Sequence, residues 1–206
     1  MEILSHRGYW LEPAEKNTVA AFQRSFGLGY GTETDVRDSC GQLVISHDPP
    51  QGGELTLAQL LELAGDQQPV LAINIKADGL AKPVADEMAR HGYANWFVFD
   101  MSIPDTRGQL AASNPTYVRM SEIEQSPPFL DQASGVWLDA FETDGWRIAA
   151  LAGLLERGLK VCLVSPELHR RAHLPFWQQL KESGLHLDAN VSLCTDLPED
   201  ATAFFR

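Results

Sequence analysis

The chain has 206 residues, of which 44% are hydrophobic and 21% charged, and its formal net charge is −12 at pH 7. This composition fits one globular domain with a sizeable core and excludes a disordered or fibrous chain. Because nucleic acids and anionic membrane surfaces would be repelled by so acidic a molecule, we expect neither as a partner.

No apolar stretch approaches the ~20 residues that a membrane-spanning helix needs, and the first residues lack the regions of a signal peptide. We therefore expect a cytoplasmic protein without stable membrane association. Cys40, Cys162 and Cys194 are odd in number and show no short metal-type spacing, which favours structural thiols.

Strand-like and helix-like segments alternate along the chain, with turn signals between them. We predict strands at residues 2–5, 32–36, 43–46, 70–76, 96–101, 116–119, 135–139, 160–164 and 191–195. We predict helices at residues 18–28, 57–64, 80–91, 147–157 and 176–183. Asn17 is expected to cap the first helix, and residues 126–134 are the least regular connection.

Repeated strand–helix units imply a parallel sheet covered by helices, either closed as an eight-stranded barrel or open. Eight strands remain when residues 43–46 are treated as an excursion, which favours the barrel. We therefore expect an α/β fold of the compact (β/α)8 TIM-barrel type, in a single domain over residues 1–206, with a minimal insertion after the second strand. In such barrels the active site lies at the carboxyl ends of the strands.

Two acidic residues stand two positions apart on a predicted strand. Because strand side chains alternate, Glu33 and Asp35 project from the same face and can converge on one cation. Mg²⁺ and Ca²⁺ prefer such oxygen ligands, and a cation held in this way can polarise a phosphoryl oxygen. The same spacing is also typical of the solvated face of an edge strand, so this alternative stays open.

Two histidines and an arginine follow predicted strands. His6 and His47 each come directly after one, where paired imidazoles are suited to act as acid and base near neutral pH. Arg7 offers a planar cation that matches a phosphate group. A structural or surface role is the alternative for each of the three, and the other histidines receive no role.

Four segments within residues 5–48 carry a resemblance to a known family. In chain order they are SHRGYW, KNTVAAF, GTETDVR and GQLVISHD. Together they resemble the N-terminal signature of the glycerophosphodiester phosphodiesterase family, a group of PLC-like phosphodiesterases with TIM-barrel folds. The segments LAINIK at 71–76 and CTDLP at 194–198 are fainter similarities.

The resemblance implies a role for each matching residue. His6 and His47 would serve as general acid and base, Glu33 and Asp35 would bind one divalent cation, and Arg7 would contact the substrate phosphate. The cation would be Mg²⁺ or Ca²⁺, with Mn²⁺ as a third candidate. The partner would be a small-molecule phosphodiester, hydrolysed to glycerol phosphate and an alcohol in lipid or glycerol metabolism.

The sequence departs from the family pattern at the third acidic ligand. Where the family has E-x-K, this chain has Asn74 two residues before Lys76. An amide oxygen can bind a hard cation but adds no negative charge, so Asn74 is either a weak ligand or a plain hydrogen-bonding residue. Lys76 is a candidate contact to phosphate, with a structural ion pair as the alternative.

Two further points stay open. Trp10, beside the first motif, is a candidate wall of the substrate site, with core packing as the alternative. The rival functions are a phospholipase-like or sphingomyelinase-like lipid phosphodiesterase on the same barrel, and a binding protein that has lost turnover. Asn74 is the feature that favours the second of these rivals.

Overall fold

The computed structural model describes residues 1–206, which divide into two compact units. The first unit comprises residues 5–116, and the second comprises residues 1–4 and 117–206. Strand β1 (Glu2–His6) begins in the second unit and ends in the first. That the whole chain acts as a single domain stays a prediction.

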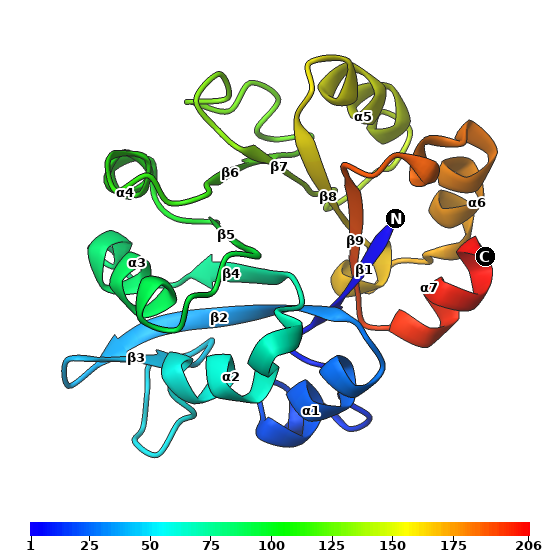
Figure 1. The fold of residues 1–206 in the computed structure, drawn as a ribbon. Helices are drawn as coiled ribbons and strands as arrows, with labels where there is room; N and C mark the ends of the chain where they lie inside the picture. The colour runs from blue at the N-terminus through cyan, green and yellow to red at the C-terminus, as the bar shows by residue number, and fades with distance from the viewer. The chain divides into compact units, whose positions relative to one another are not determined.

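The first unit is built around parallel strands. Strands β2, β4 and β5 pair in parallel in the order β5-β4-β2, and β3 pairs antiparallel with β2 (Figure 1). Its elements are η1 (Pro13–Glu15), α1 (Val19–Gly27), β2 (Gly31–Ser39), β3 (Gln42–Ile45), α2 (Leu57–Ala64), η2 (Gly65–Gln67), β4 (Leu71–Ile75), α3 (Ala81–Arg90), β5 (Trp96–Phe99) and α4 (Ile103–Ala111).

The second unit continues the alternation, with β9, β8, β7 and β6 paired in parallel in that order. No helix lies between β6 and β7, which is the connection that the sequence marks as least regular. The elements are β6 (Tyr117–Met120), β7 (Gly135–Leu138), α5 (Arg147–Glu156), β8 (Lys160–Val164), η3 (Pro166–His169), α6 (Leu174–Ser183), η4 (Leu185–Leu187), β9 (Val191–Thr195) and α7 (Pro198–Phe205).

In the first unit, one face of the sheet is apolar and packs against helices. Figure 1 shows α1 and α2 beside β2, and their side chains share one buried cluster with the strands. The strand residues in this cluster are Val36, Leu71, Ile73 and Ile75. Because side chains alternate, the residues between them project from the opposite face, away from these helices.

All nine predicted strands and all five predicted helices are confirmed, with shifts of a few residues at their ends. Helices α4 and α7 were not predicted. Helix α4 buries the polar residues Asp105, Thr106 and Gln109, so it lacks the apolar periodicity by which helices are recognised. Asn17 is not the cap of α1, because the side chain of Thr18 accepts the hydrogen bond from the Ala21 amide instead.

The cysteines and the helices bear on two other expectations. All three cysteines are free thiols; Cys162 and Cys194 are buried on β8 and β9, as expected of structural thiols, whereas Cys40 is exposed. None of the helices combines the length and apolar character that crossing a bilayer requires.

A buried arginine ties together the strands of the second unit. Arg147, at the start of α5, is fully buried and donates hydrogen bonds to the carbonyl oxygens of Leu138 (3.1 Å) and Val164 (2.5 Å). Its guanidinium lies 3.8 Å from the ring centroid of Phe176 and pairs with Asp144 at 3.1 Å. Burial is the main reason that the pKa of Arg147 is lowered to about 10.

We predict that Arg147→Met lowers the free energy of unfolding by about 3 kcal/mol, because it leaves two buried carbonyls without their donor and leaves Asp144 with Arg171 as its remaining cation. Arg157→Met is the matched control, since that arginine lies at the exposed end of the same helix. Its pair with Asp131 is open to solvent, and its loss should cost less than about 0.5 kcal/mol. Urea unfolding curves measure both, and equal curves for the two variants would contradict the structural role.

Candidate functional site

Two carboxylates are buried side by side on β2. Glu33 is 2% exposed and Asp35 is fully buried, and both project from the face of the strand opposite the apolar cluster. Like charges this close and this far from water are costly unless cations or hydrogen bonds compensate them. The neighbours of the two carboxylates therefore decide what the site can do.

Asp35 is compensated on both of its oxygens. Arg7 lies 2.9 Å from Oδ2 through its Nε atom, and the ammonium of Lys76 lies 3.4 Å from Oδ1. The side-chain amide of Asn17 donates a further hydrogen bond of 2.9 Å to Oδ2. The charge of Asp35 is thus balanced by two cations of the chain itself.

The backbone around Arg7 is shaped for this contact. Arg7 has a left-handed conformation (φ 60°), and its amide donates to the carbonyl of Glu33 at 2.9 Å. Gly8 also has a positive φ (79°), and a Cβ atom there would lie only 2.7 Å from that of Ala21. The glycine of the HRG segment is therefore required by close approach to α1.

Glu33 is less well compensated than Asp35. Burial, and secondarily the charge of Asp35, raise the pKa of Glu33 to about 7, although His6, Arg7 and Lys76 act in the opposite direction. The Nε2 atom of His6 lies 3.9 Å from Glu33 Oε2. An ionised Glu33 therefore lacks a close cation, which a bound metal ion would supply.

The oxygen atoms left without hydrogen bonds fit a hard cation. Glu33 Oε2, Asp35 Oδ1 and Asn74 Oδ1 are buried and accept no hydrogen bond, and of the three Asp35 Oδ1 has the Lys76 ammonium at 3.4 Å. Asp35 and Asn74 stand opposite each other in the parallel register of β2 and β4. These are the three predicted ligands, and two carboxylates with one amide suit Mg²⁺ or Ca²⁺. No group of three or more carboxylate, imidazole or thiol side chains is arranged to hold a metal ion.

His47 reaches this region through the hairpin of β2 and β3. It follows β3, which runs antiparallel to β2, so it is not at an equivalent end of a parallel strand. The hairpin instead brings the chain back to Asp35, whose carbonyl accepts the amide of Ser46 at 3.0 Å. The imidazole of His47 is 46% exposed, and its Nδ1 lies 2.9 Å from Asp48 Oδ1. No hydrogen bond or ion pair joins it to the buried carboxylates.

Two residues at the site were missed by the sequence analysis. Asn17, expected to be a helix cap, bridges Asp35 and Thr34, whose hydroxyl donates to the Asn17 carbonyl at 2.9 Å. Asp100, directly after β5, lies 3.9 Å from the ammonium of Lys76. Asn17 and Asp100 have the same left-handed backbone conformation as Arg7 (φ 60° and 68°). No local sequence pattern predicts this conformation.

The Trp10 side chain lies next to the first motif. Its indole nitrogen donates a hydrogen bond of 3.1 Å to the carbonyl of His6. The ring is partly exposed, so it is not a core residue. This position keeps Trp10 a candidate for substrate contact.

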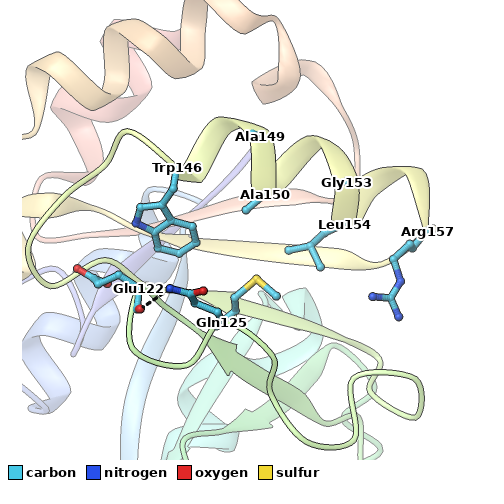
Figure 2. A pocket seen from close by; sticks show the side chains of 9 residues that line it. Glu122, Gln125, Trp146, Ala149, Ala150, Gly153, Leu154 and Arg157 are labelled. Carbon is cyan, nitrogen blue, oxygen red and sulfur yellow. Dashed lines mark hydrogen bonds between the residues drawn. The ribbon is translucent and has the colours of Figure 1, made fainter.

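A separate pocket lies in the second unit and has a different character. Its cavity has a volume of about 590 Å³. Figure 2 shows the cavity beside α5, with the Trp146 ring and Leu154 on one side and Glu122 and Gln125 on the other. Glu122 is already engaged by the backbone amides of residues 141–143. The pocket contains no imidazole and no pair of carboxylates, so it lacks the chemistry of the β2 site.

The second unit also holds an imidazole–carboxylate pair that the sequence did not indicate. His169 Nε2 lies 2.7 Å from Asp139 Oδ1, and the His169 ring stacks on Phe141 at 4.8 Å. Asp139 also accepts the Ala140 amide at 2.8 Å. No role is predicted for His169 from the sequence, because a turn context alone does not indicate a partner.

No family model and no curated protein matches the sequence. Solved structures do match. A phosphodiesterase from Oleispira antarctica, solved in complex with the product sn-glycerol-3-phosphate, has a TM-score of 0.68 and 14% identity, over 99% of this chain and 96% of its own. A glycerophosphoryl diester phosphodiesterase from Parabacteroides distasonis has a TM-score of 0.71 and 12% identity, over 98% and 85%.

A tryptophan synthase α-subunit from Pyrococcus furiosus also matches, with a TM-score of 0.57 and 14% identity, over 99% of this chain and 94% of its own. The fold is a (β/α)8 TIM barrel. This confirms the fold predicted from the alternating elements, with eight parallel strands and β3 as the excursion. Because one fold serves unrelated reactions, function must be argued from the site.

We predict that the free energy of unfolding of the metal-free chain falls between pH 5 and pH 8 more steeply than that of Glu33→Gln. In this window the folded chain keeps a proton on Glu33 that the unfolded chain, with a pKa near 4.5, has lost. Stability contributed by that proton is present below pH 4.5 and lost by about pH 7.

Plotted against pH, the changes in unfolding free energy of the wild type and of Glu33→Gln should coincide near pH 5. They should differ by roughly 2–3 kcal/mol at pH 8, since one pKa unit corresponds to about 1.4 kcal/mol. Glu62→Gln, on the exposed face of α2, is the control and should run parallel to the wild type. Urea unfolding at a series of pH values decides this. Parallel curves for Glu33→Gln and wild type would show that Glu33 is not destabilised by its surroundings.

Proposed function

We propose that the chain hydrolyses phosphodiesters with the aid of one divalent cation, and that the substrate is a glycerophosphodiester, cleaved to glycerol phosphate and an alcohol. The observation that carries the proposal is the buried pair Glu33 and Asp35, with unbonded oxygens, beside Arg7, Lys76 and His6. The similarity in fold between this chain and two phosphodiesterases, one of them solved with glycerol phosphate, supports the choice of substrate.

Glu33, Asp35 and Asn74 would hold the cation through the oxygens that make no hydrogen bond. When bound, Mg²⁺, Ca²⁺ or Mn²⁺ supplies Lewis-acid stabilisation of charge on the phosphoryl oxygens. The two carboxylates then balance the two charges of the cation, which leaves Arg7 and Lys76 as net positive charge for a phosphodiester. The acidic chain would in this way have a locally positive binding site for phosphate.

Arg7 and Lys76 would bind the phosphate. Both lie against Asp35, at 2.9 and 3.4 Å, and both are about one-fifth exposed, so they can turn toward a ligand without losing contact with the site. The guanidinium can meet two phosphate oxygens at once, whereas the ammonium acts as a point charge. Trp10 would form part of the substrate wall.

His6 and His47 would transfer the protons. One imidazole removes a proton from the attacking hydroxyl, which belongs to water or to a neighbouring position of the substrate, and the other protonates the leaving alkoxide. His6 stands beside Glu33, and His47 is held by Asp48 at 2.9 Å. Paired imidazoles serve both steps because each can be charged or neutral near pH 7.

The activity test uses the purified full chain with glycerophosphoglycerol and with bis(p-nitrophenyl) phosphate. We expect turnover that EDTA abolishes and that Mg²⁺, Ca²⁺ or Mn²⁺ restores. His6→Ala should lower kcat by about 10²- to 10⁴-fold, as loss of a general acid or base does. His91→Ala, at the end of α3, is the control and should retain activity.

The rival functions give different results in this test. Activity confined to lipid vesicles would indicate a lipid phosphodiesterase. Binding of glycerol phosphate without turnover under any of the three cations would indicate a binding protein, for which the amide of Asn74 is the supporting feature. Either result would overturn the proposed reaction.

We predict that Asn74→Glu tightens the binding of Mg²⁺ or Ca²⁺ by about tenfold or more, because a carboxylate adds charge where an amide oxygen now faces Asp35. Asn95→Asp is the control, since it adds a carboxylate at an exposed position before β5. Calorimetric titration measures both affinities. Equal or weaker binding by Asn74→Glu would rule out a ligand position at residue 74.

A further inference from the structure

A lysine covers the aromatic ring beside the candidate site. The ammonium of Lys16 lies 4.3 Å from the centroid of the Trp10 ring. Trp10 is bonded through its indole nitrogen to the carbonyl of His6, so this cation–aromatic pair adjoins the first strand end. A cation over a tryptophan face occupies the position in which such a ring would bind an ammonium group of a ligand.

The backbone fixes Lys16 next to the carboxylate site. Asn17, the next residue, donates its amide to the carbonyl of Arg7 at 2.9 Å and its side chain to Asp35 at 2.9 Å. The Lys16 amide closes the turn by bonding the carbonyl of Pro13 at 3.4 Å. Lys16 is therefore held one residue away from a direct contact to the proposed metal ligand.

The charge of Lys16 is not neutralised by an acidic neighbour. Glu15, the adjacent acid, accepts hydrogen bonds from Arg24 (3.0 Å) and from the amide of Leu11 (2.8 Å). No ion pair involves Lys16, and its ammonium contacts the Trp10 ring instead. One positive charge that no acidic side chain pairs with thus lies over Trp10, next to His6.

We propose that Lys16 makes the site select phosphodiesters whose alcohol carries no positive charge, a neutral polyol or an anionic head group, and discriminate against quaternary ammonium head groups. This inference rests on the proposed function. A choline group near Trp10 would meet an occupied ring face and a like charge. A polyol can instead accept hydrogen bonds from the ammonium, and an anionic group is attracted to it.

The test compares kcat/KM for glycerophosphoglycerol and glycerophosphocholine, which differ only in the alcohol. We expect the wild type to prefer the glycerol compound. Lys16→Gln should reduce this preference about three- to tenfold, chiefly through a lower KM for the choline compound, because the repelling charge is gone. Lys16→Arg retains the charge and should retain the preference.

Lys82→Gln is the matched control, since Lys82 pairs with Asp86 on the exposed face of α3. The ratio of kcat/KM for the two substrates should be the same in this variant as in the wild type. Equal kcat/KM values for the two substrates in the wild type, or an unchanged preference in Lys16→Gln, would overturn the role of Lys16 while the phosphodiesterase activity stands. If the wild type hydrolyses neither compound, the proposed function is overturned, and this inference with it.

Discussion

The site depends on burying two carboxylates next to each other on one strand. Removing an ionised group from water costs several kcal/mol unless other charges approach it closely. Asp35 meets this condition through Arg7 and Lys76, whereas Glu33 has only His6 at 3.9 Å. The raised pKa of Glu33 and the unbonded oxygens are two signs of the same imbalance, which a divalent cation would remove.

The backbone around this pair is held in unusual conformations. Arg7, Asn17 and Asp100 are all left-handed, although none of them is glycine, and their side chains lie against Asp35 or Lys76. Such conformations cost free energy and persist where the surrounding contacts fix them. Helices α1 and α2 provide that support by packing on the opposite face of the sheet. The polar site and the apolar core thus lie on opposite faces of the same strands.

Much of this arrangement follows from local pattern. Alternation along a strand places Glu33 and Asp35 on one face, and the same rule places Asn74 beside them once β2 and β4 pair in parallel. The contact of Asn17 with Asp35 joins residues 18 positions apart through a left-handed turn, and no periodicity encodes it. The direction of β3, which runs antiparallel to β2 and brings His47 back toward Asp35, is not specified by a strand pattern either.

The most direct test of the account is a crystal of the full chain grown with Mn²⁺ and glycerol phosphate, with anomalous diffraction used to locate the metal. We expect an anomalous peak bonded to oxygens of both Glu33 and Asp35, with the phosphate bound to the metal and to Arg7 and Lys76. Glycerol phosphate bound by the two cationic side chains with no metal between the carboxylates would contradict it.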